Sequence, residues 1–366
     1  MIAYLTRFFP FLFLSLFTVT AQASLVQMKI FGDSLSDTGN MFALSAEQIP
    51  PGSLYFDGRF SNGPNWVDQV ASQTGAGTVN NVFQSSALTG GIDNFAIGGA
   101  YTGTFPFPPG SANSNDLRLP TPTATFPGLQ QQVATYKQLL AGGAPISPGA
   151  WHVLWAGSND ILFAPIVIDT TFPTMTAVAT QAVANIGTAI DDLYGLGARE
   201  FMLFNVADIG TTPFGQLTGL APLLNFGSGL FNSELDALIA ALPGLYPGID
   251  VMFFDVNALF NDLLAGVISD PAVMALFPDA SVMSPIVPPG LSFCLDQDGL
   301  LLPAGPYFCT GMDPDDRIFY DLVHPSSRTH SIIAAAVIDV KVPEPATVTL
   351  LSLALLGMAG SRKRKN

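Results

Sequence analysis

The sequence has few charged residues, few histidines and few cysteines. Charged residues make up 11% of the 366, and there are three His and two Cys. No GxSxG, HExxH or GxxxxGK[ST] pattern occurs, which excludes a nucleophile elbow, a zinc-protease helix and a P-loop as sequence motifs. The stretch GLGARE (195–200) lacks the third glycine of a dinucleotide-binding fingerprint. Chemistry that depends on histidine therefore has few positions available.

The amino-terminal end has the features of a secretion signal. Arg7 precedes an apolar run over 8–19, and Ala21 and Ala23 form the small-x-small pattern that a signal peptidase cleaves. The sequence therefore predicts a signal peptide over 1–23, removal by signal peptidase, and a mature chain that begins near Ser24.

The carboxyl-terminal end has three ordered parts. A Pro-Glu-Pro tripeptide (343–345) is followed by an apolar stretch (346–360) and a basic cluster (362–365). This tail resembles the PEP-CTERM sorting signal of Gram-negative bacteria. The resemblance implies transient membrane association, removal of 342–366 by an exosortase-type protease, and a body in the periplasm, on the outer surface or in the extracellular matrix. The alternative is a plain carboxyl-terminal membrane anchor.

The predicted mature body is strongly acidic. Without the leader and the tail, 8 Lys and Arg remain beside 27 Asp and Glu, a net charge of −19. Such a charge disfavours nucleic acid and anionic membrane surfaces as partners. Cys294 and Cys309 lie close together in sequence, and in an exported protein they most simply form one disulfide. A metal or redox role is a poorer interpretation, since the spacing is not CxxC and no His is adjacent.

Apolar runs alternate with segments of helical spacing along the body. Continuous apolarity predicts strands buried on both faces of a parallel sheet, and the alternation predicts a single α/β domain over 24–341. The expected strands are 26–32, 94–99, 151–157, 200–206 and 250–256. The expected helices are 128–140, 174–196, 229–242, 257–266 and 326–340.

One serine, one histidine and one aspartate are candidates for nucleophilic catalysis. A serine attacks only when a base takes its proton, and the base needs a partner that fixes its tautomer. Asp321 precedes His324 by three residues, so its carboxylate can reach Nδ1 and leave Nε2 free. Ser34 follows the first predicted strand, at the edge where α/β sites usually lie.

Four separated blocks, together with a further segment at 58–71, resemble the SGNH/GDSL hydrolase superfamily, in its bacterial and plant-like esterase/lipase branch. They are FGDSLSDTGN with Ser34, NFAIGGA with Gly99, WAGSND with Asn159, and DLVHPS with Asp321 and His324. The resemblance implies a three-layer α/β/α sandwich with a flavodoxin-like parallel sheet. It also implies ester hydrolysis through an acyl-serine, with His324 as base and then acid, and an oxyanion hole formed by Ser34, Gly99 and Asn159.

Some assignments stay open in the sequence. Gly98 is adjacent to Gly99 and is the alternative oxyanion donor. Asp33 and Asp37 are interpreted as structural, one shaping the turn and the other organising the block through backbone hydrogen bonds. We interpret His152 and His330 as structural as well. Acidic residues near the cysteines fit no complete Ca²⁺ loop, so a solvated acidic surface is the favoured interpretation and no metal is predicted (Asp296, Asp298, Asp313, Asp315 and Asp316).

The sequence favours an exported serine esterase or lipase without metal or organic cofactor. Its substrate would be a lipid, a short-chain ester or an acylated polysaccharide. The alternative is a non-catalytic envelope or exopolysaccharide-matrix binding protein on the same fold. The intact set of Ser34, Asn159, Asp321 and His324 argues against that alternative, since a binding protein has no need of it.

Overall fold

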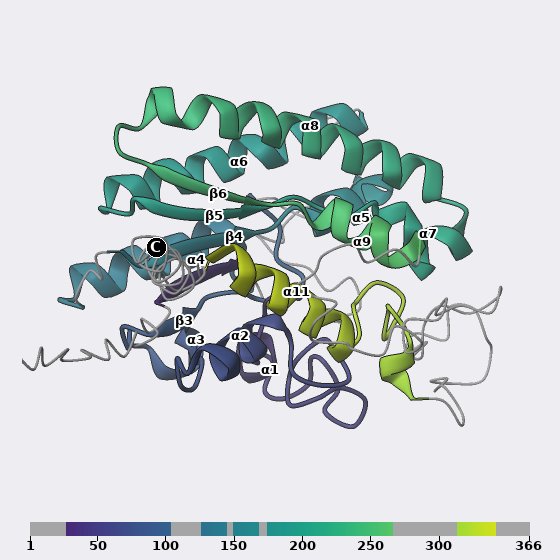
Figure 1. The fold of residues 1–366 in the computed structure, drawn as a ribbon, viewed down its shortest axis with the longest axis horizontal. Coiled ribbons are helices and arrows are strands. Elements are labelled where there is room, and N and C mark those ends of the chain that lie inside the picture. Colours follow the sequence, from purple (N-terminus) through teal and green to yellow (C-terminus); the bar gives the residue numbers. More distant parts are fainter. Residues whose placement is uncertain (1–26, 104–125, 145–148, 168–173, 266–312, 342–366) are drawn as a thin grey trace, which may run out of the picture. The chain divides into compact units, whose positions relative to one another are not determined.

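A parallel β-sheet lies at the centre of the fold in the computed structural model (Figure 1). The structure describes residues 27–103, 126–144, 149–167, 174–265 and 313–341, which all belong to one compact unit, Leu25–Pro343. Within these residues, six strands lie in the order β2-β3-β1-β4-β5-β6. Their bounds are β1 Met28–Gly32, β2 Asn80–Asn81, β3 Ile92–Asn94, β4 Trp151–Trp155, β5 Glu200–Phe204 and β6 Asp250–Phe254.

The strand order reverses at β1. From β1 the chain moves outward to β2 and β3, and it then crosses to β4 on the other side of β1. Apart from the short edge strand β2, this is the flavodoxin-like order, and such sheets carry their sites at the carboxyl ends of the strands beside the reversal. The topology therefore places the residues that follow β1 where a site is expected.

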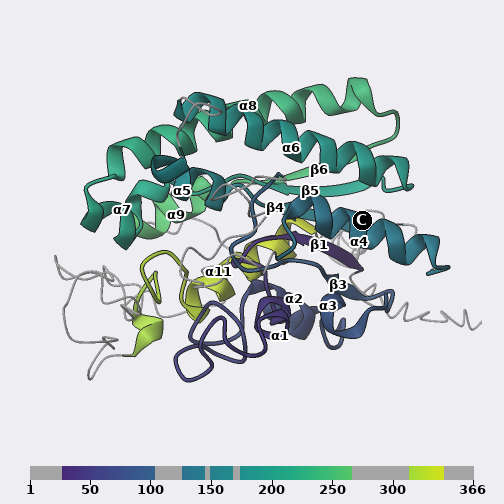
Figure 2. The same ribbon diagram turned by 180° about the vertical axis from the view of Figure 1, so that it is seen from behind.

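Helices cover both faces of the sheet (Figures 1 and 2). One buried core joins the sheet to α4, α5, α6 and α8, and a second joins its other face to α2, α9 and α11. The result is the three-layer α/β/α sandwich that the sequence resemblance implied. The helix bounds are α1 Asn40–Leu44, α2 Trp66–Thr74, α3 Val82–Ser85, α4 Leu129–Ala141, α5 Ser158–Val167, α6 Met175–Gly195, α7 Pro213–Thr218, α8 Ala221–Leu245, α9 Val256–Ala265 and α11 Ser327–Lys341.

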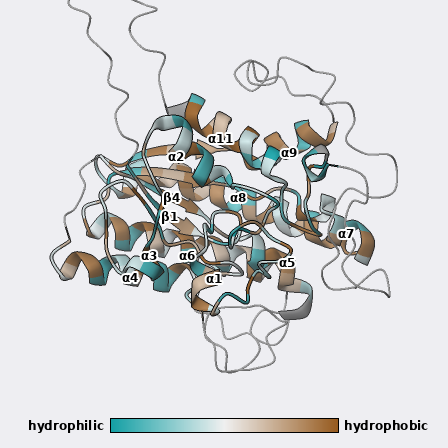
Figure 3. Ribbon diagram, turned by 90° about the horizontal axis from the view of Figure 1, so that it is seen from below, coloured by the Kyte–Doolittle hydropathy of each residue, from teal (hydrophilic) through white to brown (hydrophobic). Residues whose placement is uncertain are grey.

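Local sequence accounts for these elements. All five residues of β1 are buried, as a strand covered on both faces requires. Figure 3 shows apolar and hydrophilic residues alternating along α4 and α11, the pattern of helices that bury one side. Helix α2 begins at a capping box, in which the Asn65 side chain accepts from backbone N–H groups and the Asp68 side chain accepts from Asn65 N–H.

The predicted strands and helices are present, with two shifted boundaries. The predicted strand over 94–99 is wrong in its position, because β3 ends at Asn94. The next residues still bond to β1 through Phe95 and Ile97, but the backbone then turns at Gly99, whose φ of 76° is left-handed. Helix α8 begins at Ala221, eight residues before the predicted 229, and continues through Gly227. A Cβ at Gly227 would lie 2.8 Å from Met175 Sδ, so close packing against α6 requires glycine there.

Several predicted features lie outside the described residues. They are the signal peptide (1–23), the Cys294–Cys309 disulfide and the sorting tail (342–366). Among the helices that the structure describes, none combines the length and apolarity that crossing a bilayer would take.

Candidate active site

Ser34 lies in a tight turn directly after β1. The carbonyl of Asp33 accepts hydrogen bonds from Ser36 N–H at 3.1 Å and Asp37 N–H at 3.0 Å, which closes the turn. Gly32 ends the strand against β4, and a Cβ there would lie 2.3 Å from the carbonyl oxygen of Trp155. The glycine of the GDS sequence is thus required by close approach of two strands, and Ser34 follows from it in a fixed position.

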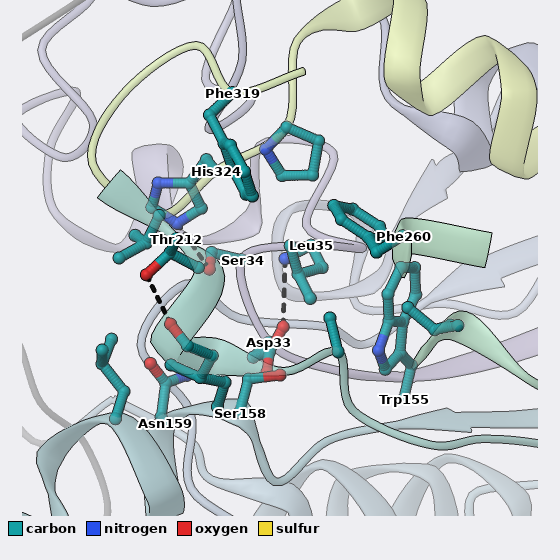
Figure 4. A pocket seen from close by; sticks show the side chains of 16 residues that line it. Asp33, Ser34, Leu35, Trp155, Ser158, Asn159, Thr212, Phe260, Phe319 and His324 are labelled. Carbon is teal, nitrogen blue, oxygen red and sulfur yellow. Dashed lines mark hydrogen bonds between the residues drawn. The ribbon is translucent and has the colours of Figure 1, made fainter. Parts of the chain in front are cut away.

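His324 contacts both Ser34 and Asp321. Its Nε2 lies 2.8 Å from Ser34 Oγ, and its Nδ1 lies 2.6 Å from Asp321 Oδ2. Figure 4 shows the imidazole ring directed at the serine hydroxyl. The structure therefore brings together three residues from the two ends of the domain in the order serine, histidine, aspartate. This arrangement can remove the serine proton and stabilise the resulting imidazolium.

The Asp321 carboxylate is surrounded by donors. Its Oδ1 accepts from Val323 N–H at 2.8 Å and His324 N–H at 2.6 Å, and its Oδ2 also accepts from Tyr55 Oη–H at 2.6 Å. Burial acts to raise the pKa of Asp321, but His324 and the hydrogen bonds from His324, Tyr55 and Val323 outweigh it and lower the pKa. Asp321 is therefore held as an anion beside the imidazole.

Asp37 organises the backbone on the other side of the serine turn. Its carboxylate accepts from four backbone N–H groups, those of Gly39, Asn40, Met41 and Gly98, at 2.7 to 3.0 Å. Burial raises the pKa of Asp37 to about 6 even though these bonds act to lower it. The interpretation of Asp37 as a structural residue acting through backbone hydrogen bonds agrees with this geometry.

The two glycines that the sequence left open have different hydrogen bonds. Gly98 N–H donates to Asp37 Oδ2 at 2.8 Å and is occupied. Gly99 N–H has no hydrogen-bond partner within the described part of the chain. Asn159 donates one side-chain hydrogen to Ala100 carbonyl at 3.0 Å, which leaves its second one available. This bond holds the Asn159 amide beside the glycine segment.

Asp33 is buried beside the nucleophile. Its Oδ1 accepts from Leu35 N–H at 3.0 Å, as expected of a residue that shapes the turn. Its Oδ2 has no hydrogen-bond partner among the described residues, and Figure 4 shows the side chain at the base of the site. Burial raises the pKa of Asp33 to about 7 and outweighs the Leu35 bond and the His324 charge. The raised pKa of Asp33 was not predicted from the sequence.

The segment over 58–71 connects the serine turn to the histidine loop. Asn65 donates to the Asp37 carbonyl at 2.9 Å on one side. Asn62 bonds to Asp315 and to Ser327 N–H at 2.8 Å each on the other. The segment thus fixes the position of the serine turn relative to the histidine loop.

Sequence reasoning also missed two aromatic residues near the histidine. Phe60 packs at 5.1 Å between ring centroids from His324. Tyr55 reaches Asp321 from a loop rich in Gly and Pro, as described above. A lone aromatic residue in such a loop carries no signal that links it to a histidine far along the chain.

The other two histidines lie outside the site. His152 in β4 and His330 in α11 are both buried. Burial lowers the pKa of His152 to about 4 and, together with the charge of His324, that of His330 to about 3, so both stay neutral. In the described residues no group of three or more His, Cys, Asp or Glu could hold a metal ion. Of the acidic residues near the cysteines, Asp315 bonds to Asn62 and Arg328 N–H, a structural use.

Comparison with known proteins identifies the family. The model of the GDSL-like lipase/acylhydrolase family matches residues 29–337. The chain belongs to this family. It is thus a hydrolase that acts on ester bonds. The PEP-CTERM protein-sorting motif matches residues 341–365, which indicates export in Gram-negative bacteria and implies exosortase processing.

The relatives of this GDSL-family protein come from bacteria and plants. It is 26% identical over 69% of its length to a phosphatidylcholine-sterol acyltransferase of Aeromonas hydrophila and spans 66% of that protein. It is 28% identical over 90% of its length to a GDSL esterase/lipase of Arabidopsis thaliana and spans 94% of it. Among solved structures, a carbohydrate acetylesterase of Sinorhizobium meliloti is similar at 13% identity and a TM-score of 0.40, covering 86% of this chain and 97% of that one.

Proposed function

We propose that the chain is an exported serine esterase that hydrolyses carboxylic esters through an acyl intermediate on Ser34. The observation that carries this proposal is the continuous hydrogen-bonded series from Ser34 Oγ through His324 to Asp321, at 2.8 and 2.6 Å. The family's ester-bond chemistry fits it. The proposal includes a leader over 1–23, a hydrolase domain over 24–341 and a tail over 342–366, with the body in the periplasm, on the outer surface or in the extracellular matrix. The sorting motif supports its export.

In the acylation step, Ser34 Oγ attacks the ester carbonyl carbon while His324 Nε2 accepts the hydroxyl proton. The carbonyl oxygen becomes an anion, and the N–H groups of Ser34, Gly99 and the Asn159 side chain donate to it. One such donor contributes about 3 kcal/mol to the transition state. His324 then gives its proton to the departing alcohol, and the acyl group stays on Ser34.

In the deacylation step, His324 accepts a proton from water, and the resulting hydroxide attacks the acyl carbon. The second tetrahedral anion lies against the same donors. Its collapse releases the carboxylic acid and returns the proton to Ser34. The Asp321 anion, with its lowered pKa, fixes the tautomer of His324 and stabilises the imidazolium in both steps.

The support for Gly99 over Gly98 comes from hydrogen bonding. The Gly98 amide already donates to the Asp37 carboxylate, so it is unavailable to a substrate. The Gly99 amide has no partner in the described residues, and Gly99 itself has the left-handed φ of 76°. We therefore assign the oxyanion role to Gly99, beside Asn159 and Ser34.

The deciding experiment is covalent labelling of the secreted protein with a fluorophosphonate probe, followed by peptide mass spectrometry. We expect label on Ser34 in the wild type and none on Ser34→Ala or after heat denaturation. Turnover of p-nitrophenyl esters should disappear in Ser34→Ala. Label on another residue, or equal turnover in the two proteins, refutes Ser34 as the nucleophile. A wild type that takes no label and turns over no ester favours the non-catalytic matrix-binding alternative. A secreted protein that still ends at Asn366 refutes removal of the tail.

A further inference from the structure

A small apolar pocket lies beside Ser34 and His324 in the described residues. Its volume is about 60 Å³, and it lies between the turn after β1, the end of β4, helix α9 and the histidine loop. Its apolar lining includes Leu35, Trp155, Val256, Phe260, Phe319 and Val323. Figure 4 shows Phe260 and Trp155 across this space from Ser34 and His324. An ester bound at Ser34 would direct one of its two substituents into the pocket.

The volume of the pocket limits what it can hold. An apolar protein cavity of about 150 Å³ accommodates benzene, with six carbon atoms. By the same measure the present pocket of about 60 Å³ accommodates two or three carbon atoms. A long fatty acyl chain does not fit without displacement of the walls.

The far walls are held by packing. Trp155 is 1% exposed and stacks on Phe204 at 4.8 Å between ring centroids. Phe260 is 4% exposed and contacts Phe319 at 5.9 Å between centroids. Close-packed interiors yield little to an oversized group, because side chains already occupy rotamer minima. The walls formed by Trp155 and Phe260 are therefore fixed.

The chemistry of the lining selects against charged groups. The residues that line the pocket include no Lys or Arg, and its carboxyl group is the buried Asp33 beside Ser34. A substituent that carries a carboxylate would lie in apolar surroundings without a cationic partner, which costs several kcal/mol. An uncharged substituent meets no such cost.

We propose that this pocket binds the acyl group of the substrate and restricts it to an uncharged chain with about two or three carbons beyond the carbonyl carbon, with Phe260 as the residue that sets the limit. The inference rests on the proposed esterase function and names the substrate class of the same site. Phe260 is the appropriate residue to test, since Trp155 belongs to the central core and Phe319 lies in the histidine loop.

The first experiment varies the acyl chain on a constant leaving group. The full chain is assayed with p-nitrophenyl acetate, butyrate, hexanoate and octanoate below their aggregation limits. We expect kcat/KM to fall at least ~10-fold from butyrate to octanoate. In Phe260→Ala the octanoate-to-acetate ratio should rise ~10-fold or more. Leu263→Ala is the matched control, because Leu263 lies on the same helix, is 4% exposed and does not line the pocket; it should keep the wild-type ratio.

The second experiment varies the alcohol on a constant acyl group, with ethyl, butyl and octyl acetate. Phe260→Ala should leave this series unchanged. If Phe260→Ala does not fold, Phe260→Leu should raise the octanoate-to-acetate ratio by a smaller factor.

Two results would overturn the pocket assignment. One is wild-type turnover of octanoate as fast as acetate, and the other is a Phe260 variant that changes only the alcohol series. Both require an active enzyme, so they differ from failure of the esterase proposal itself, in which no ester is turned over and Ser34 takes no fluorophosphonate.

Discussion

Two buried carboxylates flank the Ser34–His324 pair, one in the turn after β1 and one in the loop before α11. Asp33 and Asp321 are 0% and 2% exposed. Asp321 accepts four hydrogen bonds, one of them from the imidazole, whereas Asp33 accepts one and leaves Oδ2 without a partner in the described residues. The pKa of Asp321 is accordingly lowered, and burial raises that of Asp33 to about 7. Similar burial thus accompanies opposite pKa shifts. The charge of His324 and the hydrogen bonds from His324, Tyr55 and Val323 lower the pKa of Asp321, whereas four backbone donors without a facing imidazole leave the pKa of Asp37 raised.

The loop before α11 and the turn after β1 also contribute different groups to the site. The loop before α11 supplies an anion whose ionised form is stabilised by its surroundings. The turn after β1 supplies a carboxyl that favours its neutral form beside the nucleophile, while its second acid, Asp37, binds backbone N–H groups. Proximity to the serine alone is therefore a poor guide to which aspartate orients His324.

The largest expected effect comes from replacing the Asp321 carboxylate by a neutral amide. Asp321→Asn replaces one carboxylate oxygen by an NH2 group. At the Oδ2 position this group donates to His324 Nδ1 and stabilises the wrong imidazole tautomer, and at the Oδ1 position it opposes the N–H groups of Val323 and His324. We expect kcat/KM for p-nitrophenyl acetate to fall about 10⁴-fold with the fold retained. Asp33→Asn is the matched control and should lose less than about ten-fold, since Asp33 makes no hydrogen bond to His324. Equal losses in the two variants would remove the distinction between the two carboxylates.

The second prediction concerns the pH dependence of stability. The folded-state pKa of Asp33 lies near 7, above its unfolded value of 3.8, so its contribution to stability is lost as the pH rises from about 4 to about 7. This loss amounts to roughly 4 kcal/mol, and Asp33→Asn should lack it. The pKa of Asp321 is lowered, so its contribution is present above pH ~4 and lost on acidification below it. Urea unfolding of each variant and wild type between pH 3 and 7.5 measures both slopes; slopes of the same sign for the two sites would contradict the comparison.

The third prediction concerns Asp37, the second acid in the turn after β1. Asp37→Ala leaves four buried backbone N–H groups without their acceptor, and we expect the free energy of unfolding to fall by about 3 kcal/mol. Asp57→Ala is the control in the same region, because the Asp57 side chain is 77% exposed and its ion pair with Arg59 contributes about 0 to 1 kcal/mol. Urea unfolding at pH 7.5 measures both, and an equally small loss in Asp37→Ala would mean that water replaces the carboxylate.

The sequence predicted the parts of this site that have local signals. Ser34 follows an apolar strand and Asp321 lies one turn before His324, so pattern and spacing indicated these residues, whereas Asn159 and Gly99 came from the family resemblance. The choice between Gly98 and Gly99 depends on which amide Asp37 occupies, and that follows from a contact 61 residues apart in the chain. The pKa of Asp33 depends on burial from several elements at once, which no short pattern records.

The fold was predicted well where burial is continuous along a strand. The errors arose at glycines. The helix predicted from 229 begins at Ala221, and it includes Gly227 because Met175 and Ile161 leave no room for a side chain there. The glycine block was assigned to a strand, although its backbone turns at Gly99. In both positions tertiary packing, which is absent from local sequence, determines the role of the residue.

The smallest expected effect refines the environment of Asp321. Tyr55→Phe removes one of four donors to the carboxylate and leaves the imidazole contact, so we expect kcat/KM to fall about five-fold, the equivalent of about 1 kcal/mol. Tyr320→Phe is the matched control: its ring packs against Tyr55 at 5.5 Å between centroids, but its hydroxyl donates to the Leu54 carbonyl. If both variants lose activity equally, the two hydroxyls act through the structure of this loop, and the Tyr55 bond to Asp321 has no separate effect. If only Tyr55→Phe loses activity, the hydroxyl contributes to the stability of the anion, and a hydrogen bond that Asp321 has and Asp33 lacks has a measurable catalytic consequence.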